Sequence, residues 1–275
     1  MDFLSFGSLG LKRLEGAGGD ERFYNKMKKL DMKQTDYIIS NSKFEDDVYS
    51  GSYWPGVPIL RLGHARNDIL FDQSKDTALY IRKKVLKRLN VVDNGQRFLL
   101  FAPTHDDGNP QQAFGNLDFK NLRKVLSKKF GGEWEILIRT HNTNKQKSNK
   151  WLAGLPSFCH NTSYYPDIQE LLVLADVGLT DYSSWICDYI LTNKPSFLYG
   201  ANIKEYNRTR GFYHKIEETP FSMATTNEEL FSNINSFDEK TYKEKVKKFI
   251  EKCESVDDGK ASRRIVDKIE DLMSE

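Results

Sequence analysis

The sequence predicts an α/β fold in which parallel sheets are covered by helices on both faces. From Arg97 onward, short apolar runs alternate with segments of helical periodicity, and this alternation is typical of β-α-β units. The apolar runs are continuous, as expected of strands that are buried on both faces. The part of the chain before Arg97 shows the same pattern in a shorter form.

The second part of the chain contains the clearest elements. Residues 118–130 carry apolar side chains at helical spacing, with Asp118 able to cap the start of the helix and Gly131 its end. Pro166 is expected in the first turn of the next helix. Strands are predicted at residues 97–104, 134–140, 176–180 and 195–200, and helices at 118–130, 166–175, 183–193, 239–254 and 260–275.

The first part of the chain predicts a smaller unit. Ser42 and Glu45 have the spacing of a capping box at the start of a helix. A complete mononucleotide-binding half usually needs more strands than this part supplies, so we expect a first domain that is truncated at its amino end. Strands are predicted at residues 2–6, 36–40 and 58–63, helices at Glu21–Lys33 and 42–50, a joining basic helix at 77–90, and domains at 1–90 and 91–275.

Composition narrows the classes of function. The chain of 275 residues is long enough for one large domain or two small ones. Its 41 Lys and Arg residues against 39 Asp and Glu residues leave a net charge of +2, which does not indicate a nucleic-acid partner. Three widely spaced cysteines argue against a disulfide framework or a structural zinc and favour a reducing compartment. We find no secretory leader and no apolar run of membrane-spanning length, so we expect a soluble or membrane-surface protein.

The segment from Thr180 to Ser184 is the strongest candidate for a ligand site. A buried strand ends at Thr180, and a helix is expected to begin within two or three residues. Ser183 and Ser184 would then lie where the unpaired amides of the first helical turn point outward, and these amides favour an anion such as phosphate. Helix capping by Asp181 or Ser183 explains the same residue types without a ligand.

Two aspartates near this segment need a different interpretation, because a carboxylate repels a diphosphate. Asp181 is expected to cap backbone amides or to contact a hydroxyl group. Asp188 is expected one to two turns into the helix. There it would either orient a neighbouring basic side chain or be a buried, paired acid.

Polar residues also follow two other predicted strands. Arg139 and His141 come after one of them, and His141 could stabilise charge on a leaving diphosphate or act as a local hydrogen-bonding residue. Thr104 ends the other strand, and the His105 segment after it lacks the further ligands that a metal needs. Arg210 is of the type that clamps a diphosphate through two hydrogen bonds, with a solvated surface arginine as the alternative.

Taken together, these segments resemble the CDP-glycerol glycerophosphotransferase family, the poly(glycerol phosphate) polymerases and primases of teichoic-acid and capsule synthesis. The order and spacing of the matching residues are more specific than any one of them. The resemblance covers nearly the whole chain and implies a GT-B-type fold of two Rossmann-like domains. The matching segments are residues 7–16, 36–45, 65–68, 102–104, 180–184, 188–189, 193–195 and 210–213, together with His141, Tyr199 and Tyr206.

The resemblance implies a transferase that moves glycerol phosphate from CDP-glycerol to a polyol-phosphate or lipid-linked glycan acceptor. An acceptor hydroxyl would attack the β-phosphorus and release CMP, with no cofactor and no metal. Residues 1–90 would form the acceptor-side domain, and residues 91–275 would bind the donor. The implied site consists of His141 as the catalytic residue that stabilises phosphate charge and of Thr104, Arg139, Thr180, Asp181, Ser183, Ser184 and Arg210 as donor-binding residues.

Two positions depart from the family pattern. Phe6 stands where the family has the histidine proposed as general base, and phenylalanine cannot accept a proton. Asn142 follows His141 where the family has a proline. His64 and His105 are the candidates to replace the base, although nothing in the sequence puts either near the acceptor. A catalytically impaired nucleotide-binding remnant, pairing with a complete homologue, is therefore an alternative.

Other donors and partners follow from the same resemblance. CDP-ribitol and a sugar nucleotide are the alternative donors. The expected partners are CDP-glycerol, a lipid-linked polyol-phosphate acceptor and the inner face of the cytoplasmic membrane. The protein is expected to be cytoplasmic and peripheral to that membrane, and no nucleic-acid partner is expected. A homo-oligomer is left open. Basic residues within 82–88 and 120–129 could meet anionic lipid or form the solvated sides of ordinary helices.

Overall fold

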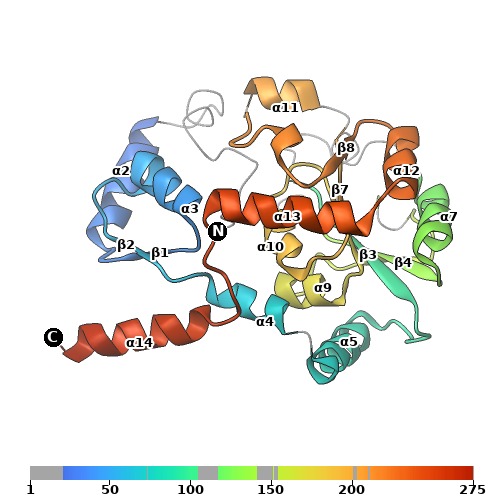
Figure 1. Ribbon diagram of the computed structural model, residues 1–275, viewed down its shortest axis with the longest axis horizontal. Helices are drawn as coiled ribbons and strands as arrows, with labels where there is room; N and C mark the ends of the chain where they lie inside the picture. Colours follow the sequence, from blue (N-terminus) through green and yellow to red (C-terminus); the bar gives the residue numbers. More distant parts are fainter. Residues whose placement is uncertain are drawn as a thin grey trace.

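In the computed structural model, the strands form two parallel sheets (Figure 1). Most of the chain builds a larger unit around a six-stranded sheet, and a smaller unit near the start contains a two-stranded sheet. The predicted α/β class with parallel sheets is therefore confirmed. The structure describes residues 21–72, 74–104, 117–140, 151, 154–200, 203–209 and 211–274.

The larger sheet has the strand order β5-β4-β3-β6-β7-β8. From the centre, the chain runs outward from β3 to β5 on one side and from β6 to β8 on the other, so β3 and β6 form a topological switch point. Open α/β sheets bind ligands beyond the carboxyl ends of the strands at such a point. The strands are β3 (Arg97–Phe101), β4 (Trp134–Ile138), β5 (Cys159–Asn161), β6 (Val177–Thr180), β7 (Ser196–Tyr199) and β8 (Ser222–Ala224).

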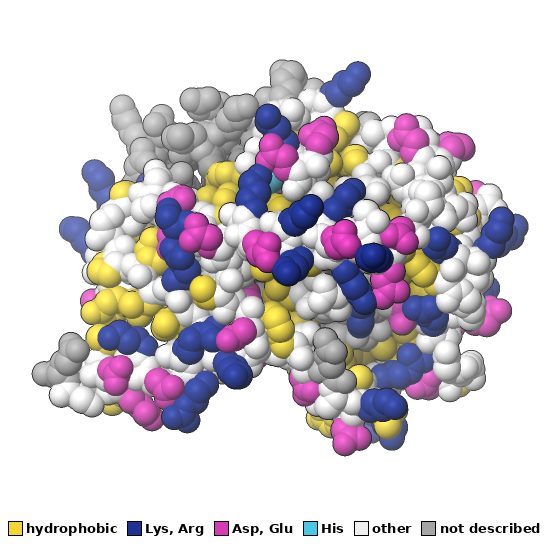
Figure 2. Space-filling view, in the orientation of Figure 1, with side chains coloured by type: hydrophobic (Ala, Val, Ile, Leu, Met, Phe, Trp, Pro, Cys, Tyr) yellow, Lys and Arg dark blue, Asp and Glu magenta, His cyan; other side chains and the backbone are white. Residues whose placement is uncertain are grey.

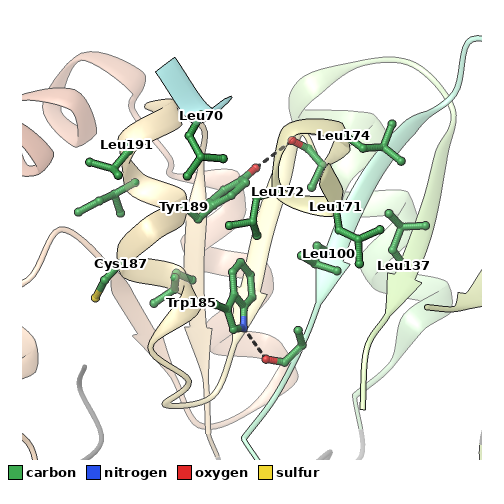
Figure 3. Packing of buried hydrophobic residues seen from close by; sticks show 14 of the residues in the cluster. Leu70, Leu100, Leu137, Leu171, Leu172, Leu174, Trp185, Cys187, Tyr189 and Leu191 are labelled. Carbon is green, nitrogen blue, oxygen red and sulfur yellow. Dashed lines mark hydrogen bonds between the residues drawn. The ribbon is translucent and has the colours of Figure 1, made fainter. Parts of the chain in front are cut away.

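Helices cover both faces of this sheet and enclose a hydrophobic core on each. On one face, Val85, Leu171 and Tyr189 are fully buried between the sheet and its helices, and Figure 3 shows how the side chains of α9 and α10 meet there. On the other face, Leu122 and Trp134 are fully buried. The first face is covered by α5 (Lys75–Leu89), α9 (Ile168–Leu174), α10 (Trp185–Tyr189) and α13 (Glu239–Cys253), and the second by α7 (Phe119–Phe130) and α12 (Asn227–Asn235).

The ends of two helices show where capping was predicted correctly and where it was not. The Asp118 carboxylate accepts a hydrogen bond from the Asn121 amide (3.0 Å), and Gly131 ends α7 with a φ of 73°, as predicted. The prediction for α9 was wrong at its start. Asp167 caps this helix, so Pro166 precedes the cap and does not lie in the first turn.

The smaller unit pairs β1 (Ile38–Ser40) with β2 (Ile59–Arg61) and adds α2 (Glu21–Lys33) and α3 (Lys43–Val48). These strands are shorter than predicted and lie within the predicted ranges. The strand predicted at residues 2–6 lies outside the described residues. A small apolar cluster holds this unit together and consists of Ile38, Tyr49 and Trp54 with Met32, Val57 and Ile59 around it.

The start of α3 forms only half of the predicted capping box. The Ser42 hydroxyl accepts from the Glu45 amide (3.2 Å), as predicted. The Glu45 carboxylate instead accepts from the amide of Asn41 (2.6 Å), one residue earlier than a capping box requires, and also contacts the ring of His64. The buried histidine gives this carboxylate a partner that the local pattern could not reveal.

Two segments connect the smaller unit with the larger one. The chain passes through η2 (Ala65–Asn67) and α4 (Asp68–Phe71) and returns after α13 to α14 (Ala261–Ser274). In Figure 1, α14 extends away from the larger unit and runs below the smaller one. Figure 2 shows basic and acidic side chains mixed along α13, as expected for a solvated helix face.

Two further expectations concern the whole chain. The division into domains at residues 1–90 and 91–275 stays a prediction, although α5 contributes Ile81 and Val85 to the core of the larger unit. Within the described parts of the chain, no helix combines the length and the apolar character needed to cross a membrane.

Candidate functional site

The carboxyl ends of β3 and β6 lie side by side at the switch point of the larger sheet. Phe101 pairs with Leu179 in parallel register, so the residues after both strands emerge at the same edge. The segment after β3 leads to Thr104, and the segment after β6 is residues 180–184. We call residues 180–184 the β6 turn.

Asp181 fastens these two segments to each other. Its Oδ1 atom accepts hydrogen bonds from the amide (2.7 Å) and the hydroxyl (2.6 Å) of Thr104 and from the amide of Tyr182 (2.5 Å). Burial raises the pKa of Asp181, and these hydrogen bonds oppose the rise. Asp181 thus contacts both backbone amides and a hydroxyl group, and its carboxylate is held by the protein itself.

The carbonyl group of Ala102 is a second fixing point. Its oxygen accepts hydrogen bonds from the hydroxyl of Thr180 (2.8 Å) and from the indole nitrogen of Trp185 (2.6 Å), the latter drawn as a dashed line in Figure 3. Thr180 is fully buried, and its hydroxyl donates to this backbone carbonyl, so Thr180 helps to fix the conformation of the β6 turn. The role of Trp185 was missed from the sequence, although a tryptophan at a helix start carries an N–H group that needs a partner when buried.

Ser183 and Ser184 are the more accessible residues of the β6 turn, because both are half-buried and the three residues before them are buried. Ser184 precedes α10, and its side chain makes no capping hydrogen bond. The helix is shorter than predicted, since it changes to a 3-10 turn at Ile190–Thr192. The turn therefore presents two small hydroxyl side chains at a helix start, the arrangement predicted to receive a phosphate.

An aromatic cluster borders the β6 turn. The rings of Tyr182, Tyr206 and Phe212 pack with centroids 4.3, 5.1 and 5.3 Å apart. The Tyr182 hydroxyl also donates to the carbonyl of Gly200 (3.1 Å), and a Cβ at Gly200 would collide with this ring. The cluster thereby holds α11 (Ile203–Thr209) and Phe212 against the turn.

Arg139 holds a loop of the protein. Its Nη1 atom donates to the carbonyls of Tyr165 (2.6 Å) and Thr162 (3.2 Å). Burial lowers the pKa of its guanidinium, and Asp167 opposes this effect. Arg139 ties the end of β4 to the loop after β5, and a contact with a donor phosphate stays a prediction.

The structure agrees with both interpretations of Asp188, as a buried acid and as a partner of a basic side chain. Asp188 is a buried acid, and its two carboxylate oxygens accept from Arg66 Nε (3.1 Å) and Asn67 Nδ2 (3.1 Å). It lies in the first turn of α10, earlier in the helix than predicted. His64 belongs to another buried pair, with its Nε2 atom 3.0 Å from both carboxylate oxygens of Glu45.

The remaining predicted residues have no structural test. Phe6, His105, His141 and Arg210 lie outside the described residues. Where the chain is described, no group of three or more His, Cys, Asp or Glu side chains is arranged to hold a metal ion. The expectation of a reaction without metal or cofactor stays a prediction.

Comparison with known families identifies the chain. The family model described as CDP-Glycerol:Poly(glycerophosphate) glycerophosphotransferase matches residues 5–271. The chain belongs to this family. The resemblance inferred from the β6 turn and the segments around it is therefore confirmed.

This glycerophosphotransferase-family chain is similar to larger proteins. The teichoic acid poly(glycerol phosphate) polymerase of Staphylococcus epidermidis is 30% identical over 240 residues, which cover 85% of this chain and 33% of that protein. The teichoic acid poly(ribitol-phosphate) polymerase of Bacillus spizizenii is 29% identical over 244 residues, 86% of this chain and 37% of that protein.

A solved structure of the wall teichoic acid polymerase TagF with CDPG matches with a TM-score of 0.76 and 28% identity, and covers 94% of this chain and 62% of that chain. This match confirms the predicted fold type. The glycerophosphotransferase-family chain thus spans about a third of each curated relative and less than two thirds of the TagF chain.

Proposed function

We propose that this family member transfers glycerol phosphate from CDP-glycerol to a polyol-phosphate or lipid-linked glycan acceptor and releases CMP, in the synthesis of teichoic acid or a capsule polymer. The β6 turn carries this proposal, because it presents Ser183 and Ser184 at a helix start beside the switch point. The family membership supports it, as do the relative named a poly(glycerol phosphate) polymerase and the TagF structure solved with CDPG.

In the proposed complex, the diphosphate of the donor lies against the β6 turn. Amides and hydroxyls at the helix start donate to its oxygens, and the helix dipole favours the negative charge. The Asp181 carboxylate would repel a diphosphate that it faced, and its bonds with Thr104 and Tyr182 hold it within the protein. This arrangement lets an anion approach despite an aspartate in the turn.

The proposed chemistry is a single displacement at phosphorus. An acceptor hydroxyl attacks the β-phosphorus, the bond from that phosphorus to the oxygen of CMP breaks, and CMP leaves. His141 and Arg210 are the expected groups that stabilise the negative charge of the phosphates. The acceptor hydroxyl must lose a proton, and Phe6, at the position of the base in the family, cannot take it.

Phe6 therefore supports a second candidate function, a catalytically impaired chain that binds the nucleotide without transferring its polyol phosphate. A CDP-ribitol donor is a variant of the first candidate, supported by the relative named a poly(ribitol-phosphate) polymerase. A sugar-nucleotide transferase of the same fold is a further variant.

The proposed partners follow from the acceptor. A lipid-linked acceptor implies a reaction at the inner face of the cytoplasmic membrane, with the chain attached at the membrane surface. The basic residues of α5 and α7 could contribute there by attraction to anionic lipid. We propose a reaction without metal, cofactor or nucleic acid, and a homo-oligomer is compatible with it.

The test compares CDP-glycerol binding by the wild-type chain and by the double variant Ser183→Ala with Ser184→Ala in a calorimetric titration. A hydrogen bond to a charged group contributes about 1.5–3 kcal/mol, so loss of even one such bond raises Kd about tenfold or more. The matched control replaces two exposed serines at the end of α12, Ser232 and Ser236, with alanine. This control should retain the wild-type affinity.

Measurement of CMP release in the same samples, after addition of a lipid-like glycerol-phosphate acceptor, separates the two candidate functions. Binding with release supports the transferase, and binding without release supports the impaired nucleotide-binding chain. A parallel titration with CDP-ribitol compares the donors. If the wild-type chain binds neither donor, or if the Ser183 and Ser184 variant binds as tightly as the wild type, the β6 turn is not the phosphate site.

A further inference from the structure

The two segments that connect the smaller and larger units meet in a buried polar junction centred on Asn67, which is fully buried. Its Nδ2 atom donates to Asp188 Oδ1 (3.1 Å) and to Asp257 Oδ2 (2.9 Å). Its Oδ1 atom accepts from Gln169 Nε2 (2.7 Å). One carboxamide therefore joins η2, α10, α9 and the segment after α13.

Asp257 extends this junction to the smaller unit. Its Oδ2 atom also accepts from Asn41 Nδ2 (2.9 Å), and its Oδ1 atom accepts from the amide of His64 (2.7 Å). Asn41 directly follows β1. Asp257 therefore links the end of β1 to Asn67 through two hydrogen bonds.

At Gly63, side chains of the second connecting segment pack closely against the backbone of the first. This glycine has a φ of +87°, and a Cβ there would lie 2.9 Å from both Asp257 Oδ1 and Ala261 Cβ. Arg264 adds a hydrogen bond from its Nε atom to the carbonyl of Leu62 (2.7 Å). Such close packing resists sliding of one segment along the other.

Asp188 connects the junction with the β6 turn. It follows Ser184 by four positions and lies on α10, which has only five residues. Its Oδ1 atom is held by Asn67, and its Oδ2 atom by Arg66. Asp188 is the fourth of these five residues and closes the first helical turn, so a fixed side chain there restrains the orientation of that turn.

We propose that Asn67, through Asp188 on α10, positions the β6 turn relative to the smaller unit. The inference rests on the proposed function for the identity of the donor that the turn receives. Asn67 and Asp188 are positioning residues that act through the helix. Their arrangement sets how the donor phosphate is presented to the acceptor side of the protein.

The charges around Asn67 explain why an amide is suited to this position. Asn67 stands between the carboxylates of Asp188 and Asp257 and donates one hydrogen to each. An aspartate at this position would repel both groups, and an alanine would deprive both of a donor. The substitution Asn67→Ala therefore loosens the link between the two connecting segments and α10.

The first test follows hydrogen–deuterium exchange in the full chain. The matched control is Gln96→Ala, because Gln96 is also a buried carboxamide, bonded to the carbonyl of Val92 (2.8 Å) and to Glu135 (3.2 Å). We expect Asn67→Ala to accelerate exchange about tenfold or more in peptides covering residues 178–189 and 36–42. Gln96→Ala should leave both regions at the wild-type rate. Equal acceleration in the two variants, or none in Asn67→Ala, overturns the inference.

A double-mutant cycle on CDP-glycerol affinity gives a readout that a merely structural role would not produce. Asn67→Ala and Asp188→Ala should each raise Kd about tenfold, and the double variant should raise it no further, because Asn67 acts on the turn through Asp188. Additive losses in the double variant would overturn the inference. If the wild-type chain binds no CDP-glycerol, the proposed function fails, and the exchange experiment still decides whether the junction positions the turn.

Discussion

The hydroxyl group of Thr104 allows a direct test of how the β6 turn is held. Thr104→Val keeps the shape of the side chain and removes its hydrogen bond to Asp181 Oδ1 (2.6 Å). The amides of Thr104 and Tyr182 still donate to that atom. A hydrogen bond to a charged group contributes about 1.5–3 kcal/mol, so the free energy of unfolding should fall by this amount at pH values where Asp181 is ionised.

The loss of unfolding free energy in Thr104→Val should become smaller as the pH falls. Burial raises the pKa of Asp181, so the folded state retains a proton at pH values where the unfolded state has lost it. As the pH falls, Asp181 becomes protonated and neutral. The hydrogen bond that Thr104→Val lacks is then a bond to a neutral group, which contributes less to stability. The difference between Thr104→Val and the wild type should then narrow to about 0.5–1.5 kcal/mol.

Urea unfolding at a series of falling pH values measures the free energy of unfolding before and after Asp181 takes up its proton. Thr140→Val is the matched control, because the Thr140 hydroxyl is buried and lies 2.9 Å from the hydroxyl of Ser163, a neutral partner. This control should lose about 0.5–1.5 kcal/mol of unfolding free energy at every pH value in the series. A loss in Thr104→Val that is no larger than that of the control, or that does not change with pH, would refute the reasoning.

Two further substitutions test the packing around the site. Gly200→Ala should lower the free energy of unfolding in urea by about 1–3 kcal/mol, because its Cβ would collide with the ring of Tyr182; an unchanged value would mean that the ring moves aside at no cost. Burial lowers the pKa of His214 from 6.5 to about 4, so the unfolded state takes up the proton first and about 3 kcal/mol of stability is lost as the pH falls through this range. His214→Phe, which keeps a ring against Phe249, should flatten the fall of stability from pH 6.5 to about 4, and a slope equal to that of the wild type would contradict this account.

The sequence was sufficient to predict the central strands of the larger sheet, but it did not predict the strands at its two edges. Strands buried on both faces leave continuous apolar runs, so β3, β4, β6 and β7 could be predicted. β5 and β8 were missed, because each has three residues and shows no recognisable period. α12 was also missed, although Thr226 caps its start.

At the candidate site, the sequence by itself determined the β6 turn and the family. An apolar strand, two serines and a following helix form a local pattern, and capping acts over one or two turns of chain. Only the tertiary structure decided the partners of the two aspartates. Asp181 meets Thr104 across 77 positions, and Asp188 meets Asn67 across 121. These contacts exist because the sheet brings distant strand ends to one edge and the connecting segments cross beside α10, and no local pattern in the sequence encodes such an encounter.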